Sequence, residues 1–208
     1  MVIQMKIALI YTGGTIGSLC KLNEPNGALA PMPFDAFSAA FELHLRPLLA
    51  PLLPPGTSWS FLPPQIYSTQ SEMLDSTDAA PSDWCDLTEQ ILDHALEYDA
   101  FLIFHGTDTL EYSANALHCL LQDLDSKKNK KTWPHSKLGK NVLLTGSQKP
   151  LFIHADASSL NLNPNSDALK NILGAMTRLV QIQHINAGVC VFFADQWWPA
   201  WGIRKWHS

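Results

Sequence analysis

The sequence has no apolar run long enough to cross a membrane, which needs about 20 consecutive residues. Only 16% of its 208 residues are charged and the net charge is −5, so no broad basic surface for nucleic acid is expected. The one lysine-rich run, residues 127–131, lies between expected elements and is interpreted as a solvated loop. A hydrophobic fraction of 46% argues against intrinsic disorder. We therefore expect a globular protein of about one domain, with no nucleic-acid or membrane partner.

Cysteine is scarce and scattered. The four cysteines form no CxxC pair, which predicts reduced thiols and argues against disulfides or zinc ligands; they are Cys20, Cys85, Cys119 and Cys190. The first ten residues carry a single lysine and run directly into an expected strand, without the separate regions of a signal peptide. The sequence therefore predicts a cytoplasmic protein.

Strand-like and helix-like segments alternate along the chain. Short apolar runs predict buried strands, and apolar residues at helical spacing predict helices. Strands are expected at residues 6–11, 59–62, 100–104, 141–145 and 188–193, and helices at residues 34–49, 83–97, 110–124 and 167–179. Such alternation implies parallel crossover connections, so the predicted fold is α/β, layered, with a mostly parallel sheet and helices on both faces.

Three of the expected strands end in small polar residues. These ends are TGGT at residues 12–15, HGTD at residues 105–108 and TGS at residues 145–147. In an open parallel sheet, ligands bind beyond the carboxyl ends of the strands, where loops from neighbouring crossovers meet. The three loops are therefore expected to converge on one crevice.

The first loop has three interpretations. Its glycines could cradle a phosphate, but it lacks the Lys-Ser/Thr ending of a P-loop and the spacing of a dinucleotide fingerprint. It could also be an ordinary glycine turn after a strand. Alternatively, Gly13 and Gly14 turn the backbone sharply and hold Thr15 close to a substrate.

The second loop places two hydroxyls and a carboxylate beside the first. A single Asp in a loop is usually a turn or cap residue, and Asp108 could cap the following helix. The pair Thr107-Asp108 also has the chemistry that a threonine enzyme needs, because a threonine hydroxyl is a weak nucleophile and requires a base or a charged network.

Two longer segments resemble a known family. LIYTGGTIG (residues 9–17) and AFLIFHGTDTL (residues 100–110) match both signature segments of the asparaginase/glutaminase family, in the family's order. LDSTDAAPSDW (residues 74–84) resembles its substrate loop, and LLTGSQKP (residues 143–150) resembles a further strand-end loop. The resemblance is to the family's N-terminal domain and covers roughly residues 6–193. The form of the loops is closer to the cytoplasmic type of bacterial enzyme than to the periplasmic type.

The resemblance implies an amidohydrolase that converts L-asparagine to L-aspartate and ammonia. Thr15 takes the position of the nucleophile that forms the acyl-enzyme, and Thr107 and Asp108 match the family's second threonine and its aspartate. Ser76 and Thr77, together with Asp108, fall where the substrate's carboxylate and amino group are held. Backbone N–H groups near Thr15 and Thr107 are expected to stabilise the oxyanion. No metal or organic cofactor is implied.

The sequence departs from the family pattern in three places. The family's mobile-loop tyrosine has no counterpart within residues 20–33, and Ala28 or Leu29 stands where it would be sought. The tail, residues 197–208, is unusually rich in tryptophan, although counting from Phe193 places Lys205 on the catalytic lysine's position. The family's second domain, which normally completes a neighbouring subunit's site, has no counterpart. We therefore divide the chain into a catalytic domain, residues 1–196, and an atypical tail, residues 197–208, that suggests truncation or a shifted reading frame.

These departures leave alternatives open. One is a truncated, inactive fragment or pseudoenzyme that keeps an amino-acid-binding crevice. Another is a related amidotransferase subunit that supplies ammonia for tRNA charging, although such proteins usually carry an extra N-terminal module. In the asparaginase interpretation, Lys205 joins Thr15, Thr107 and Asp108 as a catalytic residue, and a full-length protein is expected to form a homo-oligomer.

Overall fold

A central sheet of six strands organises the chain. The computed structural model describes residues 4–20, 28–64, 73, 75–122, 138–156, 159–185 and 188–205. The lysine-rich run at 127–131, most of the expected mobile loop (21–27) and the last three residues of the tail lie outside these ranges. The strand order is β10-β9-β6-β5-β1-β4, and every neighbouring pair is parallel except β9 and β10. The strands are β1 (Met5–Tyr11), β4 (Thr57–Phe61), β5 (Ala100–Phe104), β6 (Asn141–Thr145), β9 (Val189–Phe193) and β10 (Gln196–Pro199).

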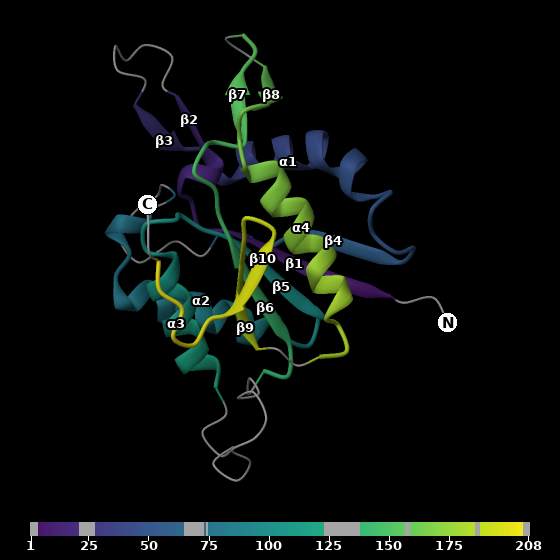
Figure 1. Cartoon of the computed structure of the whole chain (residues 1–208), viewed down its shortest axis with the longest axis vertical. Helices are drawn as coiled ribbons and strands as arrows, with labels where there is room; N and C mark the ends of the chain where they lie inside the picture. Colours follow the sequence, from purple (N-terminus) through teal and green to yellow (C-terminus); the bar gives the residue numbers. More distant parts are fainter. Residues whose placement is uncertain are drawn as a thin grey trace.

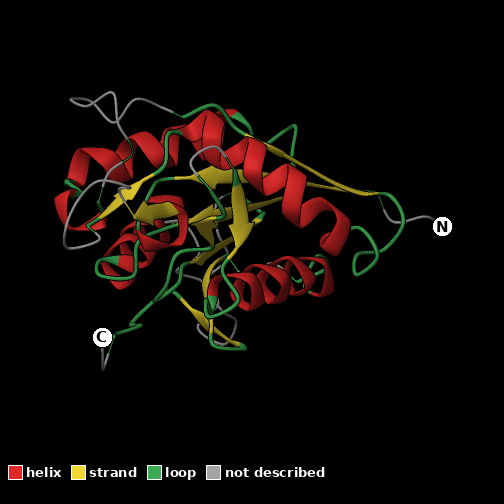
Figure 2. Ribbon diagram, turned by 90° about the horizontal axis from the view of Figure 1, so that it is seen from above, coloured by secondary structure: helices red, strands yellow, loops and turns green. Residues whose placement is uncertain are grey.

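Two pairs of helices cover the two faces of this sheet. Side chains alternate between faces along a strand, so Ile7 and Leu9 of β1 pack in one core and Ala8 and Ile10 in the other. The first core contains α1 (Phe34–Leu49) and α4 (Ala168–Gln181), and the second contains α2 (Pro81–Asp93) and α3 (Leu110–Leu121). Figures 1 and 2 show the resulting three layers. The predicted α/β layered fold is confirmed.

One crossover has the opposite hand from the others. The β1–α1–β4 connection passes over the face covered by α1 and α4 and moves toward the β4 edge of the sheet. The connections through α2 and α3 pass over the other face and move toward the β10 edge. These three therefore share one hand. The β6–α4–β9 connection continues in the direction of α2 and α3 but over the face of α1, which reverses its hand. Because about 98% of such connections are right-handed, we assign β6–α4–β9 as left-handed.

Two short hairpins extend beyond the sheet, side by side (Figure 1). The first combines β2 (Ser18–Cys20) and β3 (Leu29–Pro31), and the second combines β7 (Phe152–His154) and β8 (Leu160–Leu162). The Leu151 N–H donates to the carbonyl of Ile16 at 3.1 Å, so the chain entering the second hairpin is fixed to the segment that follows Thr15.

The helix boundaries differ from expectation mainly at α2. The helix begins at Pro81 because proline suits the first turn and the Asp83 carboxylate accepts the Ala80 N–H at 2.7 Å. It ends at Asp93, and residues 94–97 form turns, so the prediction of helix to residue 97 was wrong. No helix in the described ranges is long and apolar enough to span a bilayer.

Candidate functional site

Three strand-end loops leave the sheet side by side, as the sequence predicts. Phe104 at the end of β5 pairs with Tyr11 of β1 and with Thr145 of β6. Hydrogen bonds continue past the strands: Thr12 N–H donates to the Phe104 carbonyl at 3.1 Å, and His105 N–H donates to the Thr145 carbonyl at 2.8 Å. The loops after β1, β5 and β6 therefore start from one fixed edge.

Glycines bring these loops into backbone contact. Gly14 has φ +77°, and a Cβ atom placed on it would lie 2.3 Å from the Cα of Gly106. A Cβ atom on Gly106 would in turn lie 2.3 Å from the Oγ of Ser76. The first loop, the second loop and the segment around Ser76 are thus stacked at distances that only glycine permits.

Thr15 begins a short 3-10 helix, η1 (Thr15–Gly17), directly after this contact, and its side chain is half-buried. The Ser18 hydroxyl donates to the Gly14 carbonyl at 2.9 Å and closes the turn. In the described part of the chain, the Thr15 hydroxyl makes no hydrogen bond with Thr107, Asp108 or Lys205. The structure therefore joins Thr15 to the second loop through the backbone of Gly14.

Tyr11 packs against this turn. Its hydroxyl lies 3.1 Å from the Gly17 carbonyl and 3.2 Å from the Met32 carbonyl, and burial raises the pKa of this hydroxyl. A Cβ atom on Gly17 would collide with the Tyr11 ring. Tyr11 therefore has a packing role in this turn.

Ser76 and Thr77 lie in a second 3-10 helix, η2 (Ser76–Asp78). Ser76 is buried, whereas Thr77 is exposed and its N–H and hydroxyl both donate to the Asp75 carboxylate at 3.1 Å. The Thr109 hydroxyl donates to the Ser76 carbonyl at 2.7 Å, which ties the second loop to this segment. Ser76 thus packs against Gly106 of the second loop, and Thr77 is turned toward its neighbour Asp75.

Lys205 reaches the second loop from the far end of the sequence. Its Nζ lies 3.2 Å from the Thr107 carbonyl and 3.4 Å from Asp108 Oδ1. The Asp108 side chain is 61% exposed and that of Lys205 is 25% exposed, so solvent weakens this ion pair. The structure therefore brings Lys205, Thr107 and Asp108 together, although 97 residues separate Asp108 from Lys205.

Two side chains of α3 hold the tail that carries Lys205. The Glu111 carboxylate accepts the Lys205 backbone N–H. One turn further on, Asn115 Oδ1 accepts the Gly202 N–H at 2.9 Å and its Nδ2 donates to the Ile203 carbonyl at 3.2 Å. We call Glu111 and Asn115 the tail clamp. In the sequence these two residues stand out only as polar residues four apart on a helix that begins at the second loop.

The third loop is fixed by one buried side chain of α4. Asn171 Nδ2 donates to the Gly146 carbonyl at 2.9 Å, and its Oδ1 accepts the Ala194 N–H at 3.1 Å. It therefore links the ends of β6 and β9. The Asp167 carboxylate accepts the Gln148 N–H at 3.0 Å and fixes the rest of this loop.

His105, the first residue of the second loop, is buried. Burial lowers the pKa of the imidazole, so the ring is neutral at pH 7, and its Nδ1 lies 2.8 Å from the Gly106 carbonyl. A neutral ring that donates to this carbonyl holds the Gly106 backbone in place. Its role in the described structure is to support the glycine contact.

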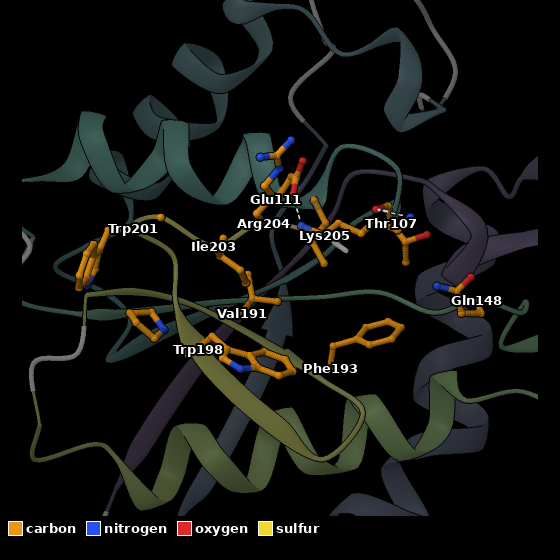
Figure 3. A pocket seen from close by; sticks show the side chains of 13 residues that line it. Thr107, Glu111, Gln148, Val191, Phe193, Trp198, Trp201, Ile203, Arg204 and Lys205 are labelled. Atoms are coloured by element: carbon orange, nitrogen blue, oxygen red, sulfur yellow. Dashed lines mark hydrogen bonds between the residues drawn. The ribbon is translucent and has the colours of Figure 1, made fainter. Parts of the chain in front are cut away.

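A groove of about 670 Å³ opens beside Lys205 and Thr107. Figure 3 shows Phe193 and Trp198 along one side, Ile203 and Lys205 along the other, and Val191 between them. Its lining is therefore apolar except at the end next to the second loop. Within the described ranges, no group of three or more His, Cys, Asp or Glu side chains could hold a metal ion.

Comparisons with known proteins agree on one family. A model of the family described as Asparaginase, N-terminal matches residues 6–127 and 133–208, so the match includes the tail. The chain is 33% identical over 159 residues to L-asparaginase 1 of Escherichia coli strain K12, covering 76% of this chain and 38% of that protein. It is 30% identical over 201 residues to the 60 kDa lysophospholipase of Homo sapiens, covering 93% and 30%.

A solved structure shows the same architecture. L-asparaginase I from Vibrio cholerae superimposes with a TM-score of 0.68 at 28% identity, covering 99% of this chain and 49% of that one. The chain spans about a third of the length of the curated relatives it matches (30% and 38%).

Proposed function

Because the chain belongs to the asparaginase family, we propose that it carries the amide-hydrolysing centre of an L-asparaginase, which converts L-asparagine to L-aspartate and ammonia. Lys205 is the observation that carries the proposal. Its ammonium group lies against Thr107 and Asp108, the residues that the family resemblance pairs with a catalytic lysine. The L-asparagine substrate, homo-oligomeric assembly and cytoplasmic location belong to the same proposal.

In this proposal Thr15 is the nucleophile. Its Oγ attacks the side-chain amide carbon, the C–N bond breaks as the nitrogen takes a proton and leaves as ammonia, and water then hydrolyses the threonyl ester to aspartate. Gly14 supports this role because its contact with Gly106 fixes the position of the backbone directly before Thr15. The half-buried position of Thr15 keeps its hydroxyl accessible to a small substrate.

Lys205, Asp108 and Thr107 form the proposed proton-handling group. In its neutral amine form Lys205 would accept a proton by way of the Thr107 hydroxyl, which activates a weak alcohol nucleophile, and the resulting ammonium, beside the Asp108 carboxylate, would return that proton to the leaving nitrogen. The exposed Asp108 carboxylate is also available to the substrate's amino group. Ser76, stacked on Gly106, and Thr77 are proposed to bind the substrate's carboxylate and amino group.

The test compares two threonines of one loop. Thr15→Ala should abolish ammonia release from L-asparagine, because the ester cannot form. Thr12→Val is the matched control, since the Thr12 hydroxyl is already donated to the Phe104 carbonyl at 3.0 Å and its loss affects only stability. Ammonia release is measured enzymatically over time. Undiminished release by Thr15→Ala would refute the proposal.

The same assay addresses the inactive-fragment alternative. If neither the unaltered chain nor Thr15→Ala releases ammonia, and both bind L-aspartate in calorimetry, the chain is a binding fragment. Lys205→Gln adds a second comparison. In an active chain it should lower the rate by about 10²- to 10⁴-fold, the usual contribution of a proton-transfer group.

A further inference from the structure

We infer that the groove beside Lys205 binds the apolar chain of a small amphiphile whose carboxylate or carbonyl head lies at Lys205. The inference deepens the proposed function, because it shares Thr107 and Lys205 with the proposed catalytic group and assigns an apolar extension to the ligands of that site. It does not require turnover, since binding alone is claimed.

The size and lining of the groove fit such a ligand. Small-molecule sites are typically clefts of about 300–1,000 Å³ that are mostly apolar with a few polar groups at fixed positions, and this groove measures about 670 Å³. Val191, Phe193, Trp198 and Ile203 supply apolar walls, and the polar groups gather at the end next to Thr107 (Figure 3). A ligand with one polar end and one apolar end matches this division.

The charge at the polar end selects the head group. Lys205 Nζ has three donors, and two are directed to the Thr107 carbonyl and Asp108, so one remains for a ligand. Arg204 also lines the groove, whereas the Glu111 carboxylate is engaged by the Lys205 backbone N–H. The remaining Nζ donor favours a head group with an acceptor oxygen, such as a carboxylate or a carbonyl.

The apolar walls come from alternation along two paired strands. Trp198 of β10 pairs with Val191 of β9, and both line the groove. The neighbouring Trp197 pairs with Phe192 on the opposite face, where the Arg178 guanidinium lies 4.4 Å from its ring. Substituting Trp198 therefore tests binding in the groove, and substituting Trp197 tests the loss of a tryptophan on the other face of the same strand.

The experiment titrates the full chain with hexanoate, octanoate and decanoate by isothermal calorimetry. Affinity should rise about fourfold for each added methylene group that the groove buries. Trp198→Ala should weaken decanoate binding about tenfold, and Trp197→Ala should leave it unchanged. Ile203→Glu places a charge in the groove and serves as a second variant; circular dichroism confirms that each variant is folded.

Two further arms test the head group and the link to catalysis. Lys205→Gln should weaken decanoate about tenfold and leave decanol unchanged, because only the ionic contact is lost. Thr15→Ala should bind decanoate like the unaltered chain, so a failed hydrolysis proposal and a failed groove are distinguishable. Absence of chain-length dependence, or equal effects of the two tryptophan variants, would overturn the inference. The inference would also be overturned by a dimer that forms as the concentration rises, dissociates in Trp198→Glu and persists in the presence of decanoate. A second copy of the chain would then cover the groove.

Discussion

Gly14 is the residue on which the loop stacking depends. It combines a left-handed φ of +77° with a contact that leaves no room for a side chain. A substitution there suffers both backbone strain and a collision with another loop's backbone, which cannot move like the end of a flexible side chain.

We expect Gly14→Ala to lower the free energy of unfolding by about 3 kcal/mol or more, of which about 1–3 kcal/mol is backbone strain, because φ +77° with ψ 177° is a conformation essentially restricted to glycine. Gly139→Ala is the matched control, because Gly139 has φ +64° but nothing lies within 4 Å of its Cβ position. It should cost the strain alone. Urea unfolding measures both, and equal losses would show that the loop contact is not tight.

Cysteine reactivity reports burial at the residue scale. Cys20, Cys85 and Cys119 are exposed, whereas Cys190 is 1% exposed in β9 and burial raises its pKa to about 12, with Arg178 opposing the shift. At pH 8 only about one Cys190 thiol in 10⁴ is ionised, and the thiolate is the reactive form.

An aromatic disulfide reagent at pH 8 should therefore modify three thiols quickly and the fourth only after unfolding. Cys190→Ala should leave the fast phase unchanged and remove the slow one. Four equally fast thiols in the folded chain would contradict the burial of β9. All four cysteines lie in the described ranges and none is in a disulfide, as the sequence predicts.

At the scale of elements, α3 connects the second loop to the tail. Its first turn follows the HGTD loop, and the two residues of the tail clamp lie in its first and second turns. One helix therefore positions both Asp108 and Lys205, which explains how residues far apart in sequence meet.

We expect Asn115→Ala to speed hydrogen exchange of the Gly202 amide about three- to tenfold, because its acceptor is lost and one hydrogen bond contributes about 0.5–1.5 kcal/mol. Leu120→Ala, an exposed change on the same helix, is the control. Unchanged exchange at Gly202 would mean that the clamp does not hold the tail in solution.

At the scale of the whole molecule, Phe37 joins α1 to the sheet and to the second hairpin. Its ring stacks on Tyr11 at 4.0 Å between centroids and meets Phe61, Phe104 and Phe152 edge-on at 5.8–6.2 Å. The ring is fully buried, and it touches β1, β4, β5 and β7.

Phe37→Ala should therefore lower the free energy of unfolding by about 3–5 kcal/mol, the range for a buried aromatic that leaves a cavity. Leu43→Ala on the same helix, where the side chain is 71% exposed, should change it by less than about 0.5 kcal/mol. Denaturant unfolding compares the two, and similar losses would contradict the packing of α1.

The sequence by itself determined the elements and the edge of the sheet at which they end. Apolar runs and helical spacing are local properties, so helix 34–49 and strands 100–104 and 141–145 appear at the expected residues. Glycine and hydroxyl residues after three parallel strands placed three polar loops side by side, because parallel strands end at the same edge.

Only the tertiary structure decided how the tail joins that edge and which way the last crossover turns. Glu111, Asn115 and Asn171 act on backbone groups more than 20 residues away, and no local pattern specifies such partners. The hand of β6–α4–β9 likewise depends on which sheet face receives the buried side of α4. An amphipathic helix fits either face in sequence, and packing in three dimensions makes the choice.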